Sequence, residues 1–313
     1  MWTRSVQSTI TLAVALLTLA GTRANATTIR TFVSGSGSDS NPCTQSAPCA
    51  TFAGALTNTS TGGEIYVLDA ADYSTTGGTT TINKPVSIIG AGARGGITGE
   101  VLIATTGLVL LKGIDIDAAG NAGIFSTTSG ANLVVDDCTI VDALWGIYFG
   151  PSGSAPSNLV VRNSVISNCL LFVGPPSAVA GIQVQGASTG IVDVTIDNVM
   201  LDNNWHGVYA LDYTNVTIRN STLTQSTHSG LRAESLTGGT VNVVLAHSES
   251  SHNLGNGVVA IGTGATIRIS EVAITDNAVG INYTTGGAVI SFGNNSVGGN
   301  LASLSPSSTV ALQ

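Results

Sequence analysis

The chain has 313 residues, of which 43% are apolar and 9% are charged, and its 10 basic and 18 acidic side chains give a net charge of −8. This balance excludes a broad basic surface for nucleic acid, and the apolar content is too high for a disordered chain. Thr, Val, Ile and Gly are abundant where a helical bundle would need Glu, Lys and Leu. We therefore expect an all-β protein that has no nucleic-acid partner.

Residues 1–26 are predicted to be a signal peptide. Arg4 supplies the positive start, 10–20 form a short apolar core, and the Ala-Asn-Ala of 24–26 is a small-x-small cleavage site. The core is about half the ~20 residues of a membrane-spanning helix and no later stretch is long enough, so we predict no membrane span, with an uncleaved anchor as the alternative. Cleavage also removes Arg23, which leaves 8 basic against 18 acidic side chains, or −10. We expect a secreted or periplasmic protein.

The segment 27–85 is predicted to hold an N-terminal cap and the first strands. Cys43 and Cys49 lie close together, each preceded by a proline, and no further Cys or His is nearby. In an exported chain this spacing favours a disulfide over a metal site. The segment 50–59 predicts a short helix that begins near Thr51 and covers one end of the fold.

From residue 86 onward the chain repeats with a period of about 24 residues. In each copy an apolar anchor is followed by further apolar residues and then by a glycine-apolar pair. Such a drifting period of β-branched residues is typical of a β-solenoid, in which equivalent strands stack about 4.8 Å apart. We predict about nine coils over 86–300 and a C-terminal tail or cap at 301–313. The anchors are Ile89, Leu111, Val135, Val161, Ile196, Ile218, Leu245, Ile269 and Phe292.

Three polar columns support this stacking. One residue past the anchors, a ladder of opposite charges is predicted on the outer surface at Lys112, Asp136, Arg162, Asp197 and Arg219. Two residues past the anchors, a bend whose side chains turn inward and bond along the stack is predicted at Asp137, Asn163, Asn198, Asn220, His247, Glu271 and Asn294. A later column with the same role is predicted at Asn204, Asn253, Asn277 and Asn300. Cys138 and Cys169 occupy different positions in their coils, so we expect them to be unbonded and buried.

The glycine-apolar pair after stretches such as IRNSTL (218–223) and VRNSVI (161–166) resembles the right-handed parallel β-helix repeats of the pectate-lyase-like superfamily. The opening VSGSGSDSNPCTQSAPCATFAGAL is similar to the start of exported bacterial members. The resemblance covers about 28–300 and implies a single right-handed parallel β-helix with a short N-terminal capping helix. It is specific for the fold and weak for function, because this scaffold hosts lyases, hydrolases, epimerases, phage spikes and adhesins.

The family's enzymes bind polysaccharide in a groove along the outer face of the stack, so outward-facing columns are the candidates here. Two residues past each glycine of the glycine-apolar pair, period-two alternation predicts an exposed strip of rings and hydrogen-bonding side chains, with Trp145 at its edge. A bland alternative is that these side chains pack against a loop. The apolar insertion 169–180 lies beside the strip, where it walls a groove, meets a partner or, as we favour, shields the rings. The predicted glycan contacts are Phe125, Tyr148, Gln183, Tyr209, Arg232 and Trp145.

No complete catalytic set is recognisable. The catalytic candidates, which match no known set, are Asp202, His206, His228 and Arg232. The carboxylates of Asp115, Asp117 and Asp142 are the candidate ligands for Ca²⁺, although the pattern places no basic residue opposite them. Otherwise no cofactor or metal is predicted.

We therefore favour an exported β-helix protein that engages extracellular or cell-surface polysaccharide. The alternatives are a polysaccharide lyase or glycoside hydrolase of this superfamily, and a structural or adhesive rod that binds protein. The aromatic residues in one outward column favour the first over the third. The acidic chain counts against an enzyme for polyuronates, because like charges repel.

Overall fold

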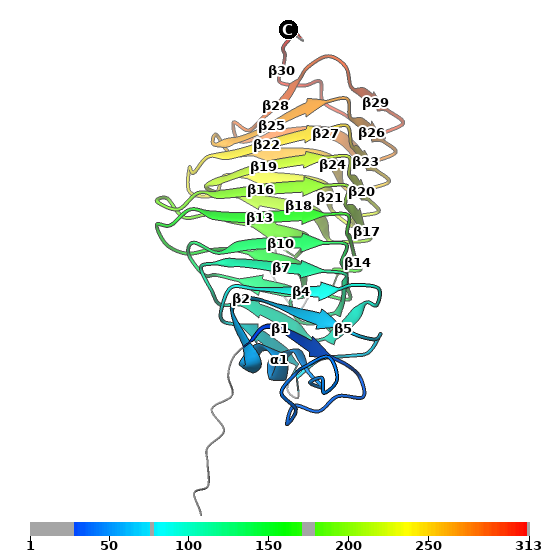
Figure 1. Cartoon of the computed structure of the whole chain (residues 1–313). Helices are drawn as coiled ribbons and strands as arrows, with labels where there is room; N and C mark the ends of the chain where they lie inside the picture. The colour runs from blue at the N-terminus through cyan, green and yellow to red at the C-terminus, as the bar shows by residue number, and fades with distance from the viewer. Residues whose placement is uncertain (1–27, 76–77, 171–178, 312–313) are drawn as a thin grey trace, which may run out of the picture.

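The computed structural model describes residues 28–75, 78–170 and 179–311. The chain forms an all-β parallel β-solenoid whose coils are stacked from strand β1 (Thr28–Val33) and helix α1 (Phe52–Asn58) at one end to β30 (Ser308–Thr309) at the other (Figure 1). The predicted signal peptide and most of the 169–180 insertion, residues 171–178, lie outside the described residues. No helix in the described ranges is long and apolar enough to cross a membrane.

Sheet 1 contains twelve parallel strands, at least one from every coil. Its inward side chains alternate with outward ones and are mostly Val, Ile and Leu, as a half-buried strand requires. In addition to β1 and β30, its strands are β2 (Thr59–Val67), β4 (Val86–Gly90), β7 (Leu108–Lys112), β10 (Asn132–Asp136), β13 (Ser157–Arg162), β16 (Val192–Asp197), β19 (Thr214–Arg219), β22 (Val241–Ala246), β25 (Ala265–Ser270) and β28 (Ala288–Ser291).

Sheet 2 contains nine short parallel strands, and each follows a strand of sheet 1 after a sharp bend. Their shortness leaves one inward side chain in most coils, for example Ile140 and Ile166, both fully buried. The strands are β5 (Gly95–Thr98), β8 (Ile114–Asp117), β11 (Thr139–Val141), β14 (Val165–Ser167), β17 (Met200–Asp202), β20 (Thr222–Thr224), β23 (Glu249–Ser251), β26 (Ala273–Thr275) and β29 (Ser296–Gly298).

Sheet 3 also contains nine parallel strands and completes each coil. The glycine-apolar pairs of the repeat lie at or beside the start of these strands, and the apolar member points inward. The strands are β3 (Thr79–Ile82), β6 (Glu100–Ile103), β9 (Ile124–Ser126), β12 (Trp145–Phe149), β15 (Ala180–Val184), β18 (His206–Leu211), β21 (Ser229–Glu234), β24 (Asn256–Ile261) and β27 (Val279–Thr284).

The predicted anchors lie in register on sheet 1, except the first and the last. Ile88 rather than Ile89 pairs with Leu111, and Ser291 rather than Phe292 pairs with Ile269. Both anchor assignments were wrong by one residue, because Ile88 and Ile89 are the same residue type and Phe292 is the apolar member of its pair. In both coils the predicted anchor is directed away from the interior.

The N-terminal end of the solenoid is closed by α1 and a disulfide loop. Phe52 is fully buried against Tyr73, with ring centroids 5.2 Å apart. The hydroxyl of Thr51 caps the helix by accepting a hydrogen bond from the Gly54 amide at 3.0 Å. A disulfide joins Cys43 and Cys49, as their spacing predicts.

The column two residues past the anchors forms the first bend, between sheets 1 and 2, and it differs from our expectation. Its members adopt left-handed backbone conformations, with φ of 47–55° at Asp137, Asn163, Asn198, Asn220, His247 and Glu271. Their side chains are exposed rather than turned inward. Asn and Asp are frequent here because they tolerate positive φ better than other non-glycine residues. The prediction of the bend was right and that of its interior face was wrong.

The later asparagine column forms the predicted interior ladder. Asn253 and Asn277 are 2% and 1% exposed, respectively. The amide of Asn253 donates to Asn277 Oδ1 at 2.8 Å, and that of Asn277 donates to Asn300 Oδ1 at 2.9 Å. The same oxygens accept backbone N–H groups of the preceding coil. These bonds satisfy polar backbone at the second bend, between sheets 2 and 3.

Cys138 and Cys169 are buried free thiols. Cys138 occupies the position that Ser164 holds in the next coil, and its backbone N–H donates to Ser164 Oγ at 3.1 Å. The N–H of Cys169 donates to Asn204 Oδ1 in the same way at 3.0 Å. Burial raises the pKa of the Cys138 thiol to about 11 and that of Cys169 to about 12, so both remain protonated at neutral pH.

Candidate functional site

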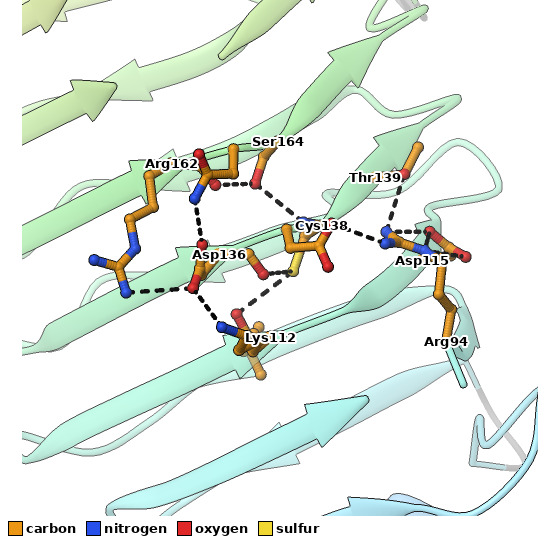
Figure 2. Close-up of polar contacts among 11 residues, drawn as sticks. Arg94, Lys112, Asp115, Asp136, Cys138, Thr139, Arg162 and Ser164 are labelled. Carbon is orange, nitrogen blue, oxygen red and sulfur yellow. Dashed lines mark hydrogen bonds and ion pairs between the residues drawn. The ribbon is translucent and has the colours of Figure 1, made fainter. Parts of the chain in front are cut away.

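The charge ladder on sheet 1 is centred on Asp136, which is 3% exposed (Figure 2). Its carboxylate pairs with Lys112 Nζ at 3.1 Å and Arg162 Nη2 at 3.2 Å, and it accepts a hydrogen bond from Asn163 at 2.8 Å. Burial alone would raise the pKa of Asp136, but these three donors outweigh it and lower the pKa. Every strong contact of this carboxylate is therefore to a neighbouring coil, which is a structural role.

Farther along the same column, Asp197 pairs with Arg219 at 3.1 Å. Arg162 and Asp197 are register neighbours as predicted, but the guanidinium of Arg162 turns to Asp136. The ladder thus consists of two separate ion-pair units.

The three aspartates considered for Ca²⁺ do not form one set. Asp115 pairs with Arg94, whose Nε lies 2.8 and 3.0 Å from its two carboxylate oxygens (Figure 2). Asp117 accepts the Ala119 backbone N–H at 3.0 Å, while Asp142 is an exposed bend residue with φ of 54°. The expectation that no cation faces this patch was wrong, because Arg94 reaches across from the turn before β5. Within the described ranges no three His, Cys, Asp or Glu side chains are grouped to hold a metal ion.

The predicted glycan column lies in register along sheet 3. Phe125 pairs with Tyr148, Tyr148 with Gln183, Gln183 with Tyr209 and Tyr209 with Arg232. The half-buried rings of Phe125 and Tyr148 are stacked, with centroids 4.9 Å apart and planes inclined by 12°. The Trp145 ring lies 5.3 Å from that of Tyr148. The part of the column on β9 and β12 therefore carries the aromatic rings that the pattern predicts.

The middle of the column differs from the expected open strip. Gln183 and Tyr209 are each only 5% exposed. Gln183 accepts the indole N–H of Trp145 at 2.8 Å, and Tyr209 packs with Ala180 and Leu211 in a small second apolar cluster. The predicted exposure of these two side chains was wrong, because alternation fixes which way a side chain points but not what packs over it.

Tyr209, Arg232 and Glu234 form a closely bonded group on β18 and β21. The hydroxyl of Tyr209 donates to Glu234 Oε2, and Arg232 contacts the same oxygen through Nε at 2.9 Å and Nη2 at 2.8 Å. The Arg232 guanidinium also lies 5.3 Å from the centre of the Tyr209 ring. Burial, followed by the hydrogen bond to Glu234, raises the pKa of Tyr209.

His206 and His228 come together beside this group. Their ring centroids are 5.6 Å apart in an edge-on arrangement, and His206 also contacts the Tyr209 ring at 5.3 Å. The exposed His228 ring stacks on Trp205, with centroids 3.9 Å apart. Burial lowers the pKa of His206 to about 3, helped by the charges of Arg232 and His228, and burial followed by Arg232 lowers that of His228. Both imidazoles are therefore neutral at pH 7.

A groove of about 480 Å³, which we call the bend groove, follows the second bend next to the Trp205–His228 stack. It is lined by Asn203, Gln225, Thr227, His252 and Leu254. Four of the five buried side-chain atoms that lack a hydrogen-bond partner in the described part of the chain belong to residues at or near this groove: Asp202 Oδ1, His206 Nδ1, Ser226 Oγ and Thr227 Oγ1. Such atoms are rare in folded proteins and mark places where a ligand or water completes the bonding.

The candidate catalytic residues are only partly brought together. His206, His228 and Arg232 gather on adjoining coils of sheet 3, whereas Asp202 ends β17 on sheet 2, one residue before Asn203 of the bend groove. Trp205 and Glu234 are not among the site residues predicted from the sequence. Trp205 stands two residues before Gly207, as His228 does before Gly230, and Glu234 follows Arg232 on the same strand face. Both signals were present in the repeat alignment.

A larger groove, of about 590 Å³, lies at the first bend between Asn220, His247, Glu249 and Glu271. There His247 Nδ1 is bonded to Glu271 Oε2 at 2.9 Å. None of the unpartnered atoms belongs to a residue that lines this groove, whereas Thr227 lines the bend groove. We therefore take the bend groove as the candidate site.

Comparisons with known proteins agree with this architecture. A family model described as "Right handed beta helix region" matches residues 146–297. Among curated proteins, none matches the sequence. The chain therefore has a parallel β-helix fold, and its residues 146–297 match the right-handed β-helix model.

Three solved structures illustrate the likeness. Pectate lyase Pel9A is 16% identical with a TM-score of 0.65, covering 92% of this chain and 79% of that one. An alginate lyase from Paenibacillus sp. str. FPU-7 is 16% identical with a TM-score of 0.55, covering 90% and 100%. The A-module of mannuronan C-5 epimerase AlgE4 from Azotobacter vinelandii is 14% identical with a TM-score of 0.51, covering 80% and 91%. At these identities the likeness establishes the fold alone.

Proposed function

We propose that this chain is an exported protein that binds polysaccharide along the bend groove and the adjoining face of sheet 3. The bend groove supports this most directly, because the Trp205–His228 stack stands beside buried, unpartnered atoms of His206 and Thr227. Flat rings pack against the apolar faces of sugars, and unpartnered polar atoms bond to their hydroxyl groups.

The lower rings extend this surface along the stack. Phe125, Tyr148 and Trp145 lie on the two coils before β15, on the same sheet as His206. From Phe125 to Arg232 the column spans four steps between neighbouring strands, or roughly 20 Å. That length suits several sugar units of a chain laid along the solenoid axis.

Export to the periplasm or the cell exterior is part of the proposal. The Cys43–Cys49 disulfide supports it, because such bonds persist in oxidising compartments. The polysaccharides of cell walls and extracellular matrices are then the available ligands.

Cleavage of the bound polysaccharide is a second candidate function, favoured by one observation. His206 is a neutral, buried imidazole whose Nδ1 has no partner in the described structure, next to the bonded Tyr209–Glu234 pair. Strongly shifted titratable groups in a cleft are frequent among catalytic residues. A proton could pass between His206 and a sugar held in the groove.

A binding and product screen tests both functions. The full chain is titrated calorimetrically with plant and bacterial glycans, and each mixture is assayed for new reducing ends and for the ultraviolet absorbance of unsaturated products. We expect His228→Ala and Tyr148→Ala to weaken binding by about tenfold or more. Tyr66→Ala is the matched control, because this half-buried ring lies on sheet 1 and its loss should change affinity less than about twofold.

Each outcome has a distinct meaning. Binding without products supports the first function, and products whose release is lost in His206→Ala support the second. If the wild-type chain binds no glycan, the proposal fails and the structural or adhesive rod that binds protein takes its place.

A further inference from the structure

The basic side chains of this protein are almost all committed to its own carboxylates. The eight Lys and Arg residues after position 27 all lie in the described part of the chain. Six of them form ion pairs: Arg30 with Glu64, Arg94 with Asp115 and Asp137, Lys112 and Arg162 with Asp136, Arg219 with Asp197, and Arg232 with Glu234. These pairs fix the charge that the surface offers to a polymer.

The two remaining cations are remote from the bend groove or bonded elsewhere. Lys84 Nζ donates to the backbone carbonyl of Thr59. Arg268 lies on β25 of sheet 1, whereas the groove follows the bend between sheets 2 and 3. Neither one places positive charge at the candidate site.

Beside the site, on β21, Arg232 carries a charge that is neutralised. Two of its nitrogens contact Glu234 Oε2 at 2.9 and 2.8 Å, and one face lies over the Tyr209 ring. His206 and His228 carry no charge at pH 7, because burial and the nearby guanidinium lower their pKa values. The groove itself is lined by the amides of Asn203 and Gln225, the Thr227 hydroxyl, Leu254, and His252, whose Nε2 lies 3.9 Å from Asp276 Oδ2.

A polyuronate would meet an unfavourable surface here. Each of its sugars carries a carboxylate that must keep its water or find a cation. The chain after position 27 has 8 basic and 18 acidic side chains, a balance of −10, and Asp202 lies one residue before Asn203 of the groove. Like charges raise the free energy of association, most strongly at low ionic strength.

Resting on the proposed function, we propose that the bend groove takes an uncharged polysaccharide and discriminates against polyuronates. Its stacked rings suit the apolar faces of neutral sugars, and the unpartnered Thr227 Oγ1 and His206 Nδ1 suit their hydroxyl groups. This sets the protein apart from the similar structures, whose names refer to pectate, alginate and mannuronan.

The ionic-strength dependence of binding tests this inference. The full chain is titrated with uncharged polymers (galactomannan, mixed-linkage glucan, chitin oligosaccharides) and with polygalacturonate and alginate, at about 20 and about 300 mM NaCl. We expect at least one uncharged polymer to bind with a Kd that changes less than about twofold between the two salts, and polyuronates to bind at least about tenfold more weakly. Tighter binding of a polyuronate, weakened by salt, would overturn the inference while leaving the proposed function in place. If no polymer of either kind binds, the proposed function itself fails.

A charge-release variant sharpens the test. Glu234→Gln removes the carboxylate that neutralises Arg232, so polyuronate affinity should rise by about tenfold at low salt while affinity for the uncharged polymer stays within about twofold. Arg232→Gln is the control and should produce no such gain. Unchanged polyuronate binding in a folded Glu234→Gln variant would contradict the inference; if that variant does not fold, the wild-type salt comparison decides.

Discussion

The interior asparagine ladder should contribute much more to stability than the exposed asparagine column of the first bend, although the two look alike in sequence. Asn277 is 1% exposed and takes part in four hydrogen bonds through its side chain. It donates to Ser250 O and Asn300 Oδ1, each at 2.9 Å, and accepts from the backbone N–H and the amide of Asn253 at 3.0 and 2.8 Å. Asn277→Ala removes all four.

The loss of stability follows from the buried polar groups that Asn277→Ala leaves without a partner. The Asn253 N–H and the Ser250 carbonyl lose the partner that Asn277 supplies, and each buried polar group left in this way costs about 1–3 kcal/mol. The Asn253 amide keeps Leu223 O and Ser250 Oγ. We therefore expect the free energy of unfolding to fall by about 2–6 kcal/mol, a large part of the 5–15 kcal/mol typical of a domain.

Asn198→Ala is the matched control. Asn198 has φ of 55° and an exposed side chain that donates to Asn163 Oδ1 at 2.9 Å. Alanine in a left-handed conformation costs about 1–2 kcal/mol, and an exposed hydrogen bond adds little. Asn198→Gly relieves the backbone cost and should be close to wild type. Urea unfolding followed by circular dichroism measures all three; if Asn198→Ala costs as much as Asn277→Ala, the distinction between the two columns is wrong.

Three further predictions follow from the same structure. The pKa of His206 is about 3 in the folded chain and 6.5 in the unfolded chain, so the unfolded chain binds more protons below pH 6.5. In urea titrations the free energy of unfolding should therefore fall by about 2–3 kcal/mol from pH 6.5 to 4.5. His206→Asn should remove most of this pH dependence. Replacing Cys43 and Cys49 by Ser opens a short loop and should lower stability by about 2 kcal/mol, whereas an unchanged melting temperature would contradict this. Ser226→Asn should extend the interior ladder, raise the free energy of unfolding by about 1 kcal/mol and weaken glycan binding. Calorimetry that shows lower stability or tighter glycan binding would refute this prediction.

The register of the solenoid could be predicted from sequence because each coil repeats the environment of the one before it. A charge at one strand position lies about 4.8 Å from its equivalents, so the alternation of Lys112, Asp136 and Arg162 carries real geometric information. The same logic found the interior ladder and the sheet 3 column. It failed for Ile89 and Phe292, in the first and last copies of the recognised repeat, although β4 and β28 have strands on both sides.

What a column position does not determine is the environment of its side chain. The recurrence of asparagine at the first bend predicts inward-facing side chains, but it reflects a backbone with positive φ. Gln183 and Tyr209 point outward as expected and are nevertheless buried. The Arg94–Asp115 pair was not predictable either, since Arg94 reaches it from a turn that has no equivalent in the repeat.

The candidate site lies beside an interruption of the interior asparagine ladder. Along the second bend the interior column runs through Asn204, Ser226, Asn253, Asn277 and Asn300, and serine replaces asparagine at one coil only. There Ser226 Oγ has no partner in the described structure, and the neighbouring Thr227 Oγ1 has none either. A repeat selected only for stability would continue the ladder through this coil, as it does through the next three. Unsatisfied polar groups that persist in an otherwise well-bonded scaffold are expected where binding requires them. The interruption of the ladder at Ser226 lies one residue from Thr227 of the bend groove, and this position ties the interior column to the proposed binding site.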